Sequence, residues 1–234
     1  MFKRIPSGIP GLDEMIGGGF LSPSVILLHG EIGTGKSVIS QQFIWEGLKR
    51  NQHGIYFCID SPPEDIRENM LSLGWDTKKY ENEEQLIFVD IFLGRIGNSN
   101  EKYFVENPYD VSQITRVMMP LLENYKNEAR VVFDSVSSLG VVNPIDSIYR
   151  FLQRLRGFII KFNCIGLINS IKGMHDPRFE ITMQQIFGNV FSLNKNERQI
   201  YLSIEKMTKT SHSKEPAKIE ITNEGIVVKK ISKQ

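Results

Sequence analysis

The chemistry that this sequence can do is concentrated in residues 30–37, which read GEIGTGKS and match the pattern GxxxxGK[ST]. Glycines at this spacing let the backbone turn tightly, so that several N–H groups point at phosphate oxygens. The lysine reaches the outer phosphates of a nucleotide, and the serine hydroxyl is a ligand for Mg²⁺. The motif therefore predicts a site for a nucleoside triphosphate with Mg²⁺. We expect the binding residues to be Gly30, Glu31, Ile32, Gly33, Thr34, Gly35, Lys36, Ser37 and Val38.

Such a loop needs an acidic partner on a nearby strand to hold the water shell of the Mg²⁺ ion. Residues 131–135 read VVFDS, which is an apolar strand pattern that ends in Asp134. We therefore expect Asp134 and Ser37 to hold the metal. The alternative for Asp134 is a strand-end or helix-capping residue.

A second carboxylate, Asp60, ends the apolar run of residues 54–60, GIYFCID. It could act at the attacking water or in the Mg²⁺ shell, or it could simply bond a neighbouring loop. The next four residues, Ser61 to Glu64, match the capping box S-x-x-E with proline at the first helical position. We therefore expect Ser61 to cap a helix rather than to take part in chemistry.

Short apolar runs alternate with helical stretches along the chain, and this alternation predicts a mostly parallel sheet with helices on both faces. The expected strands are residues 24–30, 54–60, 85–92, 129–135 and 163–170. The expected helices are residues 37–50, 62–73, 146–162 and one from about 110 that meets Pro120. Residues 94–108 and 171–180 are expected to be loops, the first of them mobile.

The segments after residue 188 alternate between apolar and polar positions and predict an antiparallel edge on this sheet. We interpret residues 1–234 as one domain. The net charge of +1 argues against a general polycation, and no apolar run is long enough to span a bilayer. Cys58 and Cys164 lie in apolar runs and are expected to be buried core residues, not a disulfide. We expect a cytoplasmic protein that does not contact a membrane.

Five segments occur in an order that resembles the single-domain KaiC-like ATPases of the RecA superfamily, which are related to the archaeal RadA paralogues and are common in archaea. These segments are IPSGIPGLDEMIGGGF (5–20), GEIGTGKS (30–37), ENMLSLGWD (68–76), VVFDSVSSL (131–139) and IEKMTKTSH (204–212). The resemblance covers about residues 5 to 228. It implies a RecA-like P-loop core, ATP with Mg²⁺, and hexameric rings with the nucleotide at subunit interfaces.

The resemblance also implies that one subunit reaches its neighbour's nucleotide through a strand that reads K-[LM]-R-x-T-x-H. In this chain Lys206, Thr210 and His212 keep three of these positions, whereas Thr208 stands where the family has arginine. Lys209 follows it, but a lysine lacks the planar fork that arginine offers to a phosphate. We call residues 206–212 the trans segment. Without the resemblance, this segment would be interpreted as a solvated turn.

In the relatives, two consecutive acids end the second strand, and the first is the base that positions the attacking water. Those positions are Asp60 and Ser61 here, so the acid is one methylene shorter than glutamate. We therefore expect tight ATP binding by a regulatory switch with slow conversion of ATP and water to ADP and phosphate, with Asp60 and Lys36 as the catalytic residues. Its nucleotide state would control ring assembly or binding of another protein.

Three other functions stay open at the level of sequence. A single-stranded DNA-binding recombinase paralogue would use the loop after the strand at residues 163–170, which carries Lys172, His175, Arg178 and Phe179. The alternative for this loop is a solvated turn. The ATP-binding component of the archaellum motor also resembles this chain. The third function is a robust ATPase motor or a kinase that phosphorylates itself on Ser or Thr, but no acceptor residue can be aligned.

Overall fold

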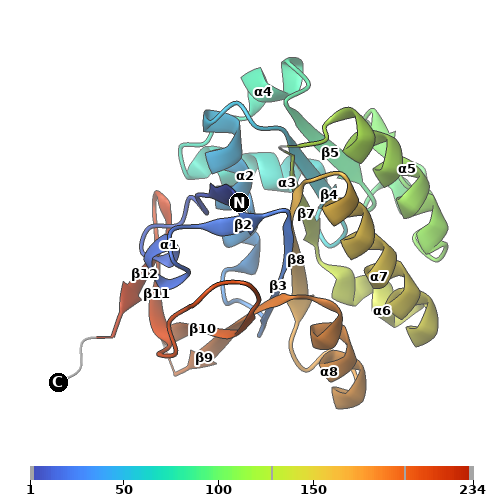
Figure 1. The fold of residues 1–234 in the computed structure, drawn as a ribbon. Helices are drawn as coiled ribbons and strands as arrows, with labels where there is room; N and C mark the ends of the chain where they lie inside the picture. The colour runs from blue at the N-terminus through green and yellow to red at the C-terminus, as the bar shows by residue number, and fades with distance from the viewer. Residues whose placement is uncertain (1–2, 128, 198, 232–234) are drawn as a thin grey trace.

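The computed structural model describes residues 3–127, 129–197 and 199–231 of the chain. Within these residues ten strands form one sheet in the order β12-β11-β10-β9-β3-β8-β7-β4-β5-β6 (Figure 1). Beside it, β1 (Lys3–Ile5) and β2 (Phe20–Ser22) pair in a small antiparallel sheet.

The middle and one side of the large sheet are parallel, whereas the other side is antiparallel. The parallel strands are β3 (Ser24–Gly30), β4 (Gly54–Cys58), β5 (Leu86–Asp90), β6 (Tyr103–Phe104), β7 (Arg130–Asp134), β8 (Ile165–Ile171) and β9 (Asn189–Asn196). The antiparallel strands are β10 (Gln199–Met207), β11 (Ala217–Thr222) and β12 (Gly225–Lys230). Strands buried on both faces carry continuous apolar runs, which explains the sequences of β4 and β5.

Helices cover both faces of the sheet, as the alternating pattern predicts (Figure 1). One face is covered by α5 (Val111–Asn124), α6 (Val136–Val142), α7 (Ile145–Lys161) and α8 (Pro177–Ile186). The other face is covered by α1 (Leu12–Met15), α2 (Lys36–Lys49) and α3 (Pro63–Ser72), with the short α4 (Lys78–Asn82) beside them. The α/β architecture with a parallel sheet and an antiparallel edge is confirmed.

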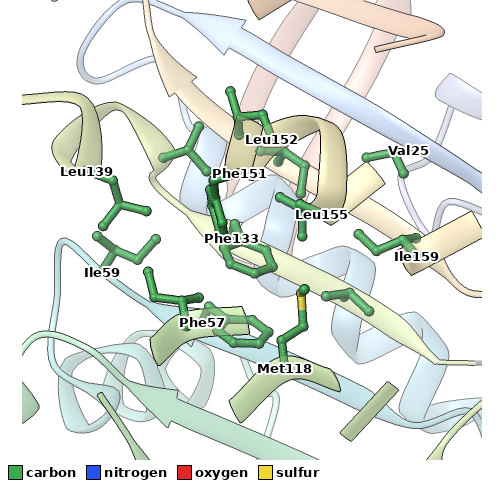
Figure 2. Close-up of a cluster of buried hydrophobic side chains, with 14 of the residues drawn as sticks. Val25, Phe57, Ile59, Met118, Phe133, Leu139, Phe151, Leu152, Leu155 and Ile159 are labelled. Carbon is green, nitrogen blue, oxygen red and sulfur yellow. The ribbon is translucent and has the colours of Figure 1, made fainter. Parts of the chain in front are cut away.

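Successive residues of a strand point to opposite faces, so each central strand contributes to two cores. In β4, Phe57 points towards α5 and α7, whereas Tyr56 and Cys58 point towards α2. The ring of Phe57 stacks on that of Phe133 in β7, with centroids 4.0 Å apart and an interplanar angle of 10° (Figure 2). This core fixes the neighbouring strands whose carboxyl ends carry the predicted site.

Several elements depart from the sequence-based expectations. Residues 94–108 were expected to be a mobile loop, but they contain a 3₁₀ turn (Gly94–Ile96) and β6, which extends the sheet. Residues 171–180 were expected to be a loop, yet α8 begins at Pro177 after an Asp176 cap. The second strand ends at Cys58 rather than at residue 60. Cys58 and Cys164 are buried as free thiols, as expected. Among the described residues, no helix is long and apolar enough to cross a membrane.

Candidate nucleotide site

The predicted phosphate-binding loop connects β3 to α2 at the carboxyl end of the parallel sheet. Gly33 and Gly35 have φ angles of 75° and 85°, a left-handed conformation that residues with a Cβ rarely adopt. Gly30 lies so close to β9 that an added Cβ would come within 2.8 Å of the carbonyl oxygen of Leu193. The glycines of the motif are therefore required by the backbone at these positions. The loop leads directly into the N-terminus of α2, where the helix dipole favours an anion.

Lys36 lies inside this loop and is only 8% exposed. Its ammonium group donates to the carbonyl oxygens of Gly30 and Glu31, each at 2.7 Å. Burial lowers the pKa of Lys36 below its ordinary value, and the negative charges of Asp134 and Asp60 oppose that shift. The cation and both predicted carboxylates thus share one electrostatic environment, although they come from three different segments of the chain.

Asp134 ends β7 and is held on both of its carboxylate oxygens. Tyr56 donates its hydroxyl proton to Oδ2 at 2.7 Å, and Asn169 donates from Nδ2 to Oδ1 at 2.8 Å. Asn169 is in turn oriented by Ser40 of α2, whose hydroxyl donates to its Oδ1 at 3.1 Å. Burial and the charge of Asp134 raise the pKa of Tyr56 well above its ordinary value, so the phenol stays a donor. The carboxylate is therefore fixed in orientation beside the loop.

The donor set around this loop suits Mg²⁺, which prefers a few protein oxygens together with substrate phosphates and water. Ser37 is exposed in the first turn of α2, and its hydroxyl has no hydrogen-bond partner among the described residues. Asp134 offers the remaining lone pairs of its carboxylate. Within the described part of the chain, no three His, Cys, Asp or Glu side chains gather into a site that would hold a metal by themselves.

Asp60 lies just past the end of β4 and is exposed. Its Oδ2 accepts hydrogen bonds from the backbone N–H of Ser135 at 3.2 Å and from the Ser135 hydroxyl at 2.7 Å. Asp60 therefore bonds a neighbouring loop, and its charge also acts on Lys36. Its role at the attacking water or in the Mg²⁺ shell stays a prediction. Its Oδ1 accepts no hydrogen bond from the described residues, so one oxygen is available to a water molecule.

The predicted capping box at Ser61 is wrong. Helix α3 begins at Pro63, so Pro62 takes the N-cap position and no side chain caps the helix. The helix starts one residue later than predicted, which moves Glu64 from the third helical position to the second. Glu64 instead faces Arg67 one turn along, at 3.4 Å.

The model of the ATPase family KaiC matches residues 5–233 of this chain. This chain belongs to the KaiC family of ATPases. The UPF0273 protein PF1931 of Pyrococcus furiosus is 35% identical to it, over 97% of this chain and 94% of the relative. A UPF0273 protein of Thermotoga maritima is 34% identical, over 97% and 96% of the two chains. The crystal structure of the KaiC-like protein PH0186 of Pyrococcus horikoshii superposes with a TM-score of 0.81 at 28% identity, covering 97% and 99% of the chains.

The trans segment of this KaiC-family chain begins two strands away from β3 and runs towards the end of the strands opposite to its own loop. Lys206 pairs with Val190, which pairs with Leu27 in the middle of β3. The loop follows Gly30, three residues further along β3, which is about 10 Å at 3.3 Å per residue. Because β10 runs antiparallel to β3, residues 208–212 continue away from the loop. The structure therefore does not bring the trans segment together with the loop of the same chain.

Contacts inside the KaiC-family fold hold parts of the trans segment in place. The Lys206 ammonium donates to the carbonyl oxygen of Phe187 at 2.9 Å. Arg4 of β1 donates to the Thr210 hydroxyl at 2.5 Å and also to the carbonyl oxygens of residues 16 and 19. Nδ1 of His212 is buried without a hydrogen-bond partner among the described residues. The N-terminal strand of this chain therefore positions the turn that follows β10.

In the loop that was considered for single-stranded DNA, three of the four candidate side chains are buried or hydrogen-bonded within the chain. Phe179 is 5% exposed and packs in the core, so it has no face to offer a base. Lys172 donates to Oδ1 of Asn194, and Nε2 of His175 lies 2.9 Å from the carbonyl oxygen of Ser137. This arrangement gives the nucleic-acid interpretation no support.

Sequence reasoning missed the polar residues that orient the site from within the sheet. Tyr56 and Asn169 hold Asp134, and their positions inside apolar strand runs are the only signal in the sequence. His29, immediately before the loop, lies 2.9 Å from the Ser170 hydroxyl through Nδ1 and 3.5 Å from Glu180 of α8 through Nε2. Burial lowers the pKa of His29, so its ring is neutral at pH 7. These contacts join residues far apart in the sequence.

Proposed function

We propose that this KaiC-family protein binds ATP with Mg²⁺ at the loop of residues 30–37 and hydrolyses it slowly, with the nucleotide state controlling assembly into a ring or binding of a protein partner. The observation that supports this most directly is the convergence of Lys36, Asp134 and Asp60 at one edge of the sheet. The family match over residues 5–233 supports treating the whole chain as one ATP-binding domain.

Each residue in this proposal has a stated task. Backbone N–H groups of residues 30–37 and the N-terminus of α2 receive the phosphates. Lys36 exchanges the two carbonyl oxygens that it now contacts for oxygens of the outer phosphates. Ser37 and Asp134 hold the Mg²⁺ ion, which supplies positive charge at the phosphates when it is bound. Tyr56 and Asn169 keep the Asp134 carboxylate in place.

Asp60 is proposed to accept the proton of the attacking water. The two hydrogen bonds from Ser135 fix one of its oxygens, which leaves the other to face the water. A base must lie within about 2.6–3.2 Å of the water that it activates. Aspartate is one methylene shorter than the glutamate of the relatives, so this distance is reached less often and the step is slow.

The site is proposed to be completed by a second copy of the chain. The trans segment cannot serve its own loop, because it begins about 10 Å short of the loop along the strand direction and runs away from it. In a closed ring each copy presents the same edge to the next copy, so every loop would meet one trans segment. We propose a hexamer on the strength of the family resemblance.

Light scattering with and without ATP and Mg²⁺, combined with hydrolysis measured on the same sample, tests this function. We expect assembly that depends on the nucleotide and a turnover below about 1 s⁻¹, the low end of the usual range for enzymes. Lys36→Ala should abolish nucleotide binding and the assembly that follows it. A wild-type turnover well above that value, or assembly unchanged by Lys36→Ala, would contradict the proposal.

A further inference from the structure

A small cleft of about 80 Å³ opens at the edge of the sheet that carries the trans segment. Among the residues that line it are Ser24 and Asn189, which belong to the starts of β3 and β9, and Thr208 and Lys209, which follow β10. Arg156 of α7 also lines it. Arg156 is therefore a neighbour of the position at which the relatives have arginine and this chain has threonine.

Helix packing places Arg156 at this cleft. Leu155 and Ile159 are fully buried and fix the face of α7 that lies on the sheet. Arg156 follows Leu155 and precedes Ile159 by one turn, so its stem starts at the border of the buried face. Its guanidinium is exposed and makes no hydrogen bond or ion pair with any described residue. Arg67, by contrast, is engaged by Glu81 and Glu101.

The chemistry of the cleft suits an anion. No Asp or Glu is among the described residues that line it, whereas Arg156 and Lys209 bring two positive charges. The Ser24 hydroxyl is buried there without a hydrogen-bond partner. The Asn189 amide is already used, because it accepts the backbone N–H of Thr208 and donates to the carbonyl oxygen of Val25. The guanidinium is thus the strong donor that this edge leaves unused.

We propose that Arg156 supplies, to the nucleotide of the adjacent subunit, the guanidinium that Thr208 does not. The proposal rests on the ring assembly described above and names a catalytic residue for it. Arginine presents two parallel N–H donors that match a phosphate, and charge on the terminal phosphate grows towards the transition state. Arg156 therefore contributes to hydrolysis more than to ground-state affinity.

Arg156→Ala and Arg154→Ala form a matched pair on one helix. Arg154 is exposed too, but it lines a different cleft together with Asp110 and Ser112. Affinity is measured with a fluorescent ATP analogue, and hydrolysis in single turnovers on assembled protein. An arginine supplied from a partner is worth about 10³–10⁵ in other P-loop proteins, and we expect a loss of at least about 10-fold here because the base is also short. Arg154→Ala should hydrolyse at the wild-type rate, and affinity should stay unchanged in both variants.

Mixing two defective variants tests whether Arg156 acts on a neighbour. Asp60→Ala keeps the phosphate-binding loop and Arg156 but lacks the proposed base, and Arg156→Ala keeps the base but lacks the arginine. Both variants are expected to bind nucleotide and to assemble. In randomly mixed rings, half of the subunits carry the base and half of their neighbours supply Arg156, so about one quarter of the wild-type rate should return. A mixture that is no more active than its components would overturn the proposal.

Two further outcomes separate this inference from the proposed function. A wild-type protein that never assembles with ATP contradicts the ring itself. Rings that form normally but hydrolyse equally fast after Arg156→Ala and Arg154→Ala overturn the role of Arg156 and leave the ring intact. If Arg156→Ala fails to assemble, Arg156→Lys decides the question, because it keeps the charge and loses the fork. The role of Arg156 would be refuted if Arg156→Lys rings hydrolysed ATP at the wild-type rate. It would also be refuted if wild-type rings formed but did not hydrolyse ATP.

Discussion

Lengthening the carboxylate at residue 60 should speed up hydrolysis. Asp60→Glu keeps the charge and adds one methylene at the position where the relatives have their longer acid. The site has room for this change, because Asp60 is exposed and only its Oδ2 is engaged, by Ser135. The variant therefore tests whether reach alone limits the chemistry of this site.

The size of the effect follows from geometry. One methylene extends the carboxylate by about 1.3 Å, and misplacement of about 1 Å at a reacting group costs about 100-fold in rate. We therefore expect Asp60→Glu to hydrolyse ATP about 100-fold faster, which corresponds to about 2.7 kcal/mol of activation free energy. Asp60→Ala should be slower than the wild type, because it removes the base.

The assay is single-turnover hydrolysis at saturating ATP and Mg²⁺, with nucleotide affinity measured in parallel. Asp65→Glu is the matched control, since Asp65 is exposed on α3 and makes no hydrogen bond or ion pair among the described residues. Equal rates for Asp60→Glu, Asp60→Ala and the wild type would show that residue 60 plays no part in the chemistry. A gain in affinity without a gain in rate would point to a role in the Mg²⁺ shell instead.

Three other substitutions test the remaining parts of the structure. Asp134→Asn should remove the part of the ATP affinity that depends on Mg²⁺. Titrating ATP into the variant and the wild type, once with Mg²⁺ and once with a chelator, measures this. An equal loss of ATP affinity under both conditions would contradict a role in binding the metal. Phe133→Ala should lower the free energy of unfolding by about 3–5 kcal/mol, because it empties a fully buried position stacked on Phe57; urea unfolding measures this. Burial lowers the pKa of His29 below 6.5, although Glu180 opposes the shift. The unfolded chain therefore takes up the His29 proton at a higher pH than the folded protein does. This contribution to the free energy of unfolding is fully present above about pH 6.5. As the pH decreases from that value, the free energy of unfolding decreases by up to about 1.4 kcal/mol per pH unit. His29→Asn should flatten that slope in urea unfolding at a series of pH values, and an unchanged slope would exclude His29 as its source.

The sequence determined those features whose physical cause is local. Residues 30–37 are contiguous, and the left-handed turns at Gly33 and Gly35 require glycine whatever surrounds them. Apolar runs bounded by turn residues predicted the central strands, and Asp134 was found because it ends one of them. The resemblance to KaiC-like ATPases also depends on short ordered segments, and the family match confirms it.

The tertiary structure decided everything that depends on contacts between distant segments. Asp60 receives its hydrogen bonds from Ser135, and Asp134 receives one from Asn169, because neighbouring strands bring their ends together. Helix α3 begins one residue later than its local capping signal predicted, whereas α8 begins at a local signal that the sequence analysis passed over, since Asp176 caps the helix and Pro177 starts it. Arg156 and Thr208 lie some fifty residues apart, and only the fold places both on one cleft. No periodicity or motif records such a pairing, because it arises from the order of strands in the sheet.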